Sequence, residues 1–88
     1  MEFVVLKLLR QQHLTLAVAE GLTGGLLSAR LSEIDYDMTT FRGGTVSGEL
    51  EDCKGSGAKI AEEAAARVRK NFGADVGIAV AAERNYQE

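Results

Sequence analysis

Six consecutive residues of this chain, EGLTGG at positions 20–25, have the types and spacing of a small reactive site. The apolar run from Thr15 to Ala19 is typical of a buried strand, and helical spacing begins at Gly25. Strand-to-helix turns of α/β proteins hold nucleophiles, and their helix N–H groups bind anions. The position directly after Glu20 is Gly21, which has no side chain. Three interpretations stay open: a working site, a site without its nucleophile, or a tight turn.

The other groups of this turn also have two interpretations each. Thr23 carries the only hydroxyl of this turn and is better placed as the N-cap of the following helix than as a nucleophile. Thr23, Gly24 and Gly25 could present N–H groups to an anion, which a helix N-terminus favours by roughly 0.3–1 kcal/mol, or could only start a closely packed helix. Glu20 could orient a ligand or accept hydrogen bonds from the backbone. We predict these four residues as ligand-binding candidates.

Two glycines further along, Gly43 and Gly44, interrupt a second strand-like run and complete the set of ligand-binding candidates. A β-bulge explains them slightly better. Cys53, the single cysteine, could replace a lost nucleophile only beside a base, and the only histidine, His13, lies far away in the sequence. A dyad of these two is disfavoured. Three basic residues near the chain's end indicate a solvated helix face: Arg67, Arg69 and Lys70.

The composition limits the class of protein. Eighty-eight residues suffice for one small domain. A net charge of −3 argues against nucleic acid as the main partner, although one small phosphorylated ligand is compatible with it. One cysteine cannot form an internal disulfide, and the apolar run of four residues before Lys7 is too short for a signal peptide or a membrane span. We expect a cytoplasmic protein with no membrane partner.

The elements that must hold these residues alternate along the chain in the order α-β-α-β-α-β. Gly73 is placed to end the last helix. Such alternation predicts an α/β fold, with a small three-layer α/β/α domain and a mostly parallel sheet over residues 1–88. Both sheet edges need cover, so a homo-oligomer is one expectation. The expected helices are 2–11, 25–31 and 58–72, the strands 15–19, 41–47 and 75–82, and the loops 32–40 and 49–58.

The opening stretch, LTLAVAEGLTGGLLSARL (14–31), resembles the signature of the CinA (competence/damage-inducible protein) C-terminal domain family, the nicotinamide-mononucleotide amidohydrolases. Two other segments, FRGGTVS (41–47) and FGADVGIAV (72–80), are similar to that family's second strand and third-strand region. The resemblance implies hydrolysis of the amide of nicotinamide mononucleotide to ammonia and nicotinate mononucleotide. It implies no metal and no organic cofactor. A serine of the turn would attack, a lysine and a tyrosine would help to move the proton, and backbone N–H groups would hold the oxyanion.

The departures from that family's pattern fall on the reactive positions. The serine position is Gly21, the tyrosine position is Gly48, and the lysine position is Cys53, with Lys54 one place late. The family's T-G-I-A-G-P run after the third strand is replaced by AAE at 81–83. We therefore expect a truncated CinA C-terminal-like domain with no catalytic residue and without amidohydrolase activity. Two alternatives stay open: a non-catalytic module that binds a pyridine nucleotide or other small anion or forms oligomers, or a piece of a larger active enzyme.

Overall fold

Helices and parallel strands alternate along the chain. The computed structural model describes residues 2–21, 25–35, 39–50 and 57–81. This order confirms the predicted α-β-α-β-α-β arrangement, with one short 3₁₀ helix added after the second strand. The elements are α1 (Glu2–Gln11), β1 (Leu16–Glu20), α2 (Leu26–Ile34), β2 (Phe41–Val46), η1 (Gly48–Leu50), α3 (Gly57–Asn71) and β3 (Val76–Val80).

The strand β1 is the centre of a three-stranded parallel sheet with the order β2-β1-β3. Leu16 pairs with Phe41, but Ala17 pairs with Gly43, so β2 has one extra residue, Arg42, opposite β1. Such a step of two residues against one is a β-bulge. Gly43 has a φ of 149° there, a backbone conformation that favours glycine. The bulge predicted from the glycine pair is confirmed.

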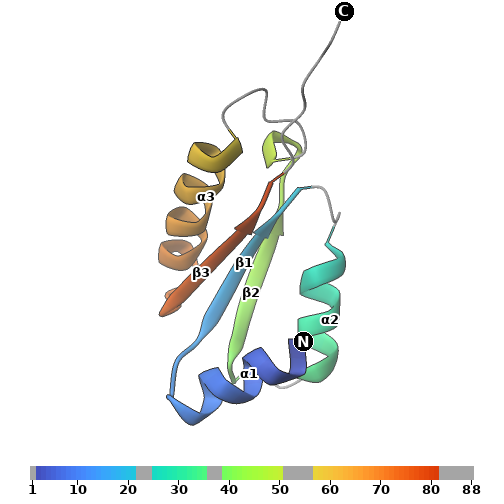
Figure 1. The fold of residues 1–88 in the computed structure, drawn as a ribbon, viewed down its shortest axis with the longest axis vertical. Helices are drawn as coiled ribbons and strands as arrows, with labels where there is room; N and C mark the ends of the chain where they lie inside the picture. Colours follow the sequence, from blue (N-terminus) through green and yellow to red (C-terminus); the bar gives the residue numbers. More distant parts are fainter. Residues whose placement is uncertain (1, 22–24, 36–38, 51–56, 82–88) are drawn as a thin grey trace, which may run out of the picture.

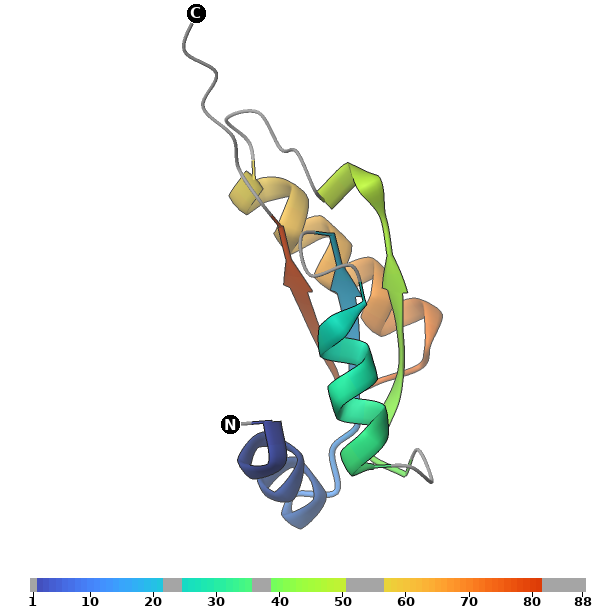
Figure 2. The same cartoon turned by 90° about the vertical axis from the view of Figure 1, so that its right-hand side faces the viewer.

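Helices cover both faces of this sheet (Figures 1 and 2). α3 lies along one face, while α1 and α2 lie on the other. Parallel neighbours need a crossover connection, and here α2 joins β1 to β2 on one face whereas α3 joins β2 to β3 on the other. The predicted three-layer α/β/α architecture is confirmed.

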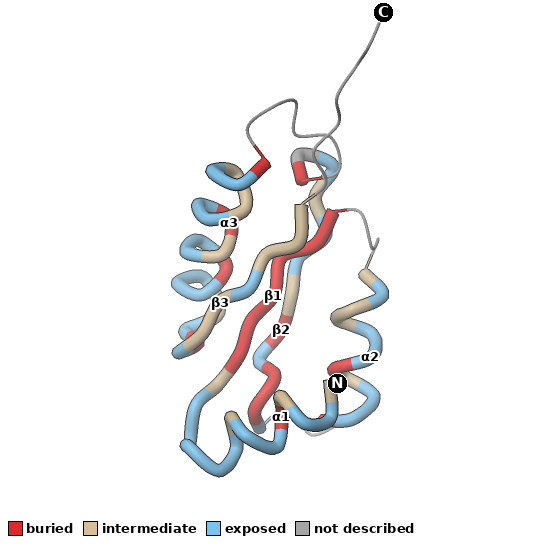
Figure 3. The backbone as a smooth tube through the Cα atoms, viewed as in Figure 1, coloured by how far each residue is buried: buried red, intermediate tan, exposed pale blue. Residues whose placement is uncertain are grey.

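Each face of the sheet has its own apolar core, and β1 is buried along its whole length (Figure 3). Its alternate residues point to opposite faces, so Ala17 and Ala19 pack under α3, whereas Leu16 and Val18 pack under α1 and α2. Small residues on the α3 side let that helix come close to the strands. The other buried members of the two cores are Leu50, Ala64, Val68 and Ala74 on the α3 side, and Leu6, Leu31 and Phe41 on the other.

The helix α2 differs from its prediction at both ends. It begins at Leu26 after the N-cap Gly25, which has a φ of 100° and no side-chain cap, so the prediction that Thr23 caps the helix is wrong. Thr23 itself lies outside the described residues. The helix also continues through residues 32–34, where a polar loop was expected. Leu31 is buried against the sheet, and the hydroxyl of Ser32 donates to the Ser28 carbonyl oxygen (2.8 Å), so the polar residues fit the helix.

Two helices end in the same left-handed motif. After α3, Gly73 has a φ of 61°, and the amides of Gly73 and Ala74 donate to Lys70 and Arg69 carbonyls, the pattern of a Schellman cap. The predicted C-cap glycine is confirmed. The same pattern follows α1, where His13 has a φ of 58°. His13 is therefore an exposed turn residue.

A buried carboxylate joins α1, α2 and β2. Asp35 accepts hydrogen bonds from the amides of Phe41 (2.7 Å) and Thr40 (2.8 Å), from the Thr39 hydroxyl and from the Arg10 guanidinium. Burial alone would raise the pKa of the Asp35 carboxyl, but these donors outweigh burial and hold that pKa below its usual range. The contact fixes the start of β2 against the end of α2.

Candidate functional site

The carboxyl ends of the three strands meet at the turn that follows β1. The amide of Gly21 donates to the Val80 carbonyl at the end of β3 (3.2 Å), and the amide of Ser47, just after β2, donates to the Glu20 carbonyl (2.8 Å). In open α/β sheets ligands bind outside the carboxyl ends of the strands, where successive connections leave on opposite faces. With the order β2-β1-β3, α2 leaves β1 on one face and α3 follows β2 on the other, so that point lies at the ends of β1 and β2, beside Gly21.

Gly21 is buried at this point and offers only backbone atoms. A serine here would place a hydroxyl at the end of the central strand, beside the start of α2. With glycine, the residue contributes an N–H group, which is hydrogen-bonded to Val80. Position 21 therefore carries no nucleophile.

Glu20 shows which of its two predicted roles its side chain fulfils in the fold. It is fully buried, with 0% of its surface exposed. Its Oε1 accepts from the Leu27 amide (2.8 Å), and its Oε2 accepts from the Ser28 amide (2.8 Å) and the Ser28 hydroxyl. Gly25 has no side chain with which to cap α2, so a carboxylate from the neighbouring strand satisfies two of the helix's unpaired N–H groups. The capping role is confirmed.

This cap changes the expectation for anion binding at α2. The first-turn amides of Leu27 and Ser28 are directed to Glu20, and a carboxylate already interacts with the positive end of the helix dipole. Of the predicted donors, Gly25 is within the described residues, whereas Thr23 and Gly24 are outside them. An anion at this turn would therefore depend on the amides before Leu27.

The two strand glycines pack against side chains from opposite faces. A Cβ added at Gly43 would lie 2.5 Å from the Phe72 ring, on the α3 face. A Cβ added at Gly44 would lie 2.4 Å from the Ser28 hydroxyl oxygen, on the α2 face. Glu20, Gly25 and Gly44 are thus brought together around the start of α2, while Gly43 is separated from them by the sheet. Ser28, which bridges Glu20 and Gly44, was not predicted as a site residue.

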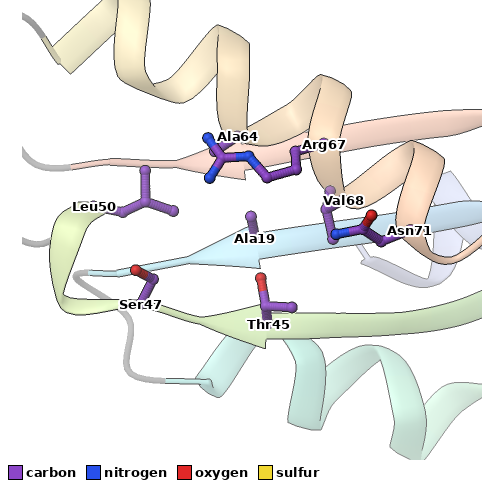
Figure 4. Close-up of a pocket in the computed structure, with 8 residues that line it drawn as sticks. All are labelled: Ala19, Thr45, Ser47, Leu50, Ala64, Arg67, Val68 and Asn71. Carbon is purple, nitrogen blue, oxygen red and sulfur yellow. The ribbon is translucent and has the colours of Figure 1, made fainter.

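A cavity opens on the α3 face near the same edge (Figure 4). Its volume is about 190 Å³. Buried apolar side chains from β1, η1 and α3 form part of its wall, and polar side chains from β2, from Ser47 just after it and from α3 complete the lining. The residues are Ala19, Thr45, Ser47, Leu50, Ala64, Arg67, Val68 and Asn71. None of the predicted site residues is among them.

Other chemistry considered from the sequence finds no support in the described ranges. His13 lies in the turn before β1, at the opposite end of that strand from Gly21, and Cys53 is outside the described residues. Within residues 2–21, 25–35, 39–50 and 57–81, no group of three or more His, Cys, Asp or Glu side chains could hold a metal ion. No helix in those same ranges has the length and apolar character needed to cross a bilayer.

The fold and the turn together define a doubly wound α/β domain built around a strand-to-helix turn at its central strand. The model of the CinA C-terminal domain matches residues 1–51, and the chain belongs to this family. It is 40% identical to a CinA-like protein of Frankia casuarinae over 90% of the chain and 22% of that protein. A CinA-like protein of Acaryochloris marina is 36% identical over 91% of the chain and 22% of its own length.

The chain thus spans about a fifth of the length of these relatives. No solved structure matches it. The matches to the relatives extend past the family model's last matched residue, and this agrees with the resemblance noted for residues 72–80.

Proposed function

We propose that this chain is a CinA C-terminal domain that does not hydrolyse nicotinamide mononucleotide. The observation that carries the proposal is Gly21, buried at the end of the central strand where the family's pattern has serine. Amide hydrolysis by that pattern needs an oxygen nucleophile to attack the carboxamide carbon and a base to take the proton. Glycine supplies neither an attacking atom nor a transferable proton.

The partner positions for proton transfer support the same proposal. The family's tyrosine position is Gly48, at the start of η1, and a Cβ added there would meet nothing within 4 Å. The lysine position is Cys53. Loss of a nucleophile alone lowers turnover by about 10⁶ in hydrolases that depend on one, so three substitutions leave no route of the family's kind.

The test is release of ammonia from nicotinamide mononucleotide by the 88-residue chain, in the presence of a metal chelator. We expect a rate equal to that of a protein-free blank. Robust turnover that persists with the chelator would overturn the proposal, because it would require a nucleophile that the family's pattern does not use.

A second candidate function is binding of a pyridine nucleotide or another small anion without hydrolysis. The supporting observation is that Glu20 holds the start of α2 beside the end of β1 through Leu27 and Ser28, although position 21 has no reactive side chain. Calorimetry with nicotinamide mononucleotide tests it. A binding isotherm at millimolar ligand is expected, and no heat of binding would count against this candidate.

A further inference from the structure

The cavity between α3 and the strands β1 and β2 has a divided lining (Figure 4). Four of its residues are buried and apolar, with exposed fractions of 2–7%. The exposed part of the lining is polar and includes Thr45 from β2, with Arg67 and Asn71 one helical turn apart on α3. The apolar part consists of Ala19, Leu50, Ala64 and Val68. A cavity of this kind suits a ligand with an apolar body and one polar end.

Among the described residues that line the cavity, the single charge is that of Arg67. Its side chain runs from α3 toward Leu50 through the space above the strands (Figure 4). Glu63 precedes it by four residues and could form an intrahelical pair, but among the residues that the structure describes the ion pairs involve other side chains, those of Arg10 and Arg30. The guanidinium therefore faces the cavity without a carboxylate partner from the described part of the chain.

We propose that this cavity binds a small organic acid, with its carboxylate on Arg67 and its apolar body against Ala19, Ala64 and Val68. A guanidinium binds a carboxylate through paired, charge-assisted hydrogen bonds. The Thr45 hydroxyl and the Asn71 amide supply further polar contacts at the same rim. The volume fits, because a cavity of roughly 150 Å³ holds a benzene-sized body.

This site is separate from the turn on which the proposed function depends. It lies on the α3 face, whereas Ser28 and the start of α2 lie on the other face. It uses neither Gly21 nor the N–H groups of α2. The failure of one proposal would leave the other standing.

The test compares benzoate with benzamide, which have the same shape and differ in charge. Each is titrated into the chain while backbone amide signals are followed by NMR. We expect benzoate to bind in the millimolar range and to shift the amides of Ser47 and Asn71, with benzamide at least about tenfold weaker, the equivalent of one charge-assisted hydrogen bond. Equal binding of the two compounds, or no shift with benzoate, would overturn the proposal.

Two charge-matched variants separate the site from general attraction. Arg67→Gln is expected to weaken benzoate binding about tenfold, whereas Arg69→Gln, on the same helix and outside the cavity lining, should leave it unchanged. An equal loss in both variants would contradict a specific site. Inorganic phosphate is the third probe: weaker binding than benzoate is expected, and equal or tighter binding would overturn the requirement for an apolar body.

Discussion

Glu20 accepts hydrogen bonds from the first-turn N–H groups of α2, the capping task that an N-cap serine, threonine, aspartate or asparagine performs at many other helices. Its two oxygens accept from Leu27 and Ser28, and the same serine fills the space beside Gly44. One buried side chain thus fixes where the helix begins relative to the end of β1 and to β2. The start of α2 is therefore held by residues that would not themselves react.

Glu20→Gln tests this role. Glutamine would place an NH₂ group, which is a donor, where a Glu20 oxygen accepts from a backbone N–H group. We therefore expect a loss of about 1.5–3 kcal/mol in the free energy of unfolding. Urea denaturation measures it. Glu33→Gln, a change of the same kind at an exposed position of α2, is the control. A Glu20→Gln variant as stable as this control would contradict the capping role.

Asp35 is the second buried carboxylate with a structural role, and its lowered pKa gives a pH dependence. The group binds protons less readily in the folded state than in the unfolded state. Its stabilising contribution is therefore complete above its unfolded pKa of about 3.9 and is lost as the pH falls through the lower folded pKa.

Asp35→Asn should therefore lower the free energy of unfolding at neutral pH by about 1.5–3 kcal/mol, since one acceptor oxygen and the charge are lost. The gap between the variant and the parent chain should narrow as the pH falls below about 4. Urea denaturation at a series of pH values gives both curves. A gap that stays constant down to the acid transition would show that the ionised form is not what stabilises the fold.

At the scale of elements, the packing of α3 depends on glycine at one position of β3. A Cβ added at Gly77 would lie 2.2 Å from the Ala65 carbonyl oxygen and 2.8 Å from the Arg69 Cβ. Backbone and a Cβ cannot move aside as the end of a flexible side chain can. The close approach of α3 to β3 therefore depends on glycine at this position.

Gly77→Ala is expected to destabilise the chain by about 1–3 kcal/mol, the usual cost of overpacking. Gly48→Ala is the matched control, because a Cβ there meets nothing within 4 Å. Thermal unfolding by circular dichroism compares them. Equal melting temperatures for the two variants would contradict the close packing of α3 on β3.

Local signals in the sequence predicted the elements well. The spacing and composition of the apolar runs located all three strands. Gly73 marked the end of α3 because glycine favours the left-handed conformation that it adopts there. The extra turn of α2 was missed because two of its three residues, Ser32 and Glu33, are polar, and the burial of Leu31 against the sheet decides its length. Helix ends depend on such tertiary contacts.

The candidate site was less accessible to prediction. The glycines at 43 and 44 indicated close approach, but only the fold shows that Phe72 and Ser28 are the partners. Glu20 was assigned two roles, and the choice between them needed the position of α2. Arg67 of α3 and Thr45 of β2 line the same cavity, which only the fold brings together. The sequence of α3 alone therefore predicted a solvated face for that arginine.

At the scale of the whole molecule, the chain has the family's scaffold, and we propose that it lacks the family's reaction. The chain shares 36–40% identity with two CinA-like proteins over most of its length, and its turn keeps Glu20 and Gly25 in defined positions. At Gly21, Gly48 and Cys53 the chain departs from the residues that the resemblance implies for attack and proton transfer.

The most direct measurement is the rate at which the unmodified chain deamidates nicotinamide mononucleotide, with ammonia and nicotinate mononucleotide quantified together. The account predicts that neither product exceeds the protein-free blank, and that Thr23→Val behaves identically. Multiple turnovers with the two products in equal amounts would contradict it. If those turnovers disappeared in Thr23→Val, the remaining hydroxyl of the turn would be the nucleophile.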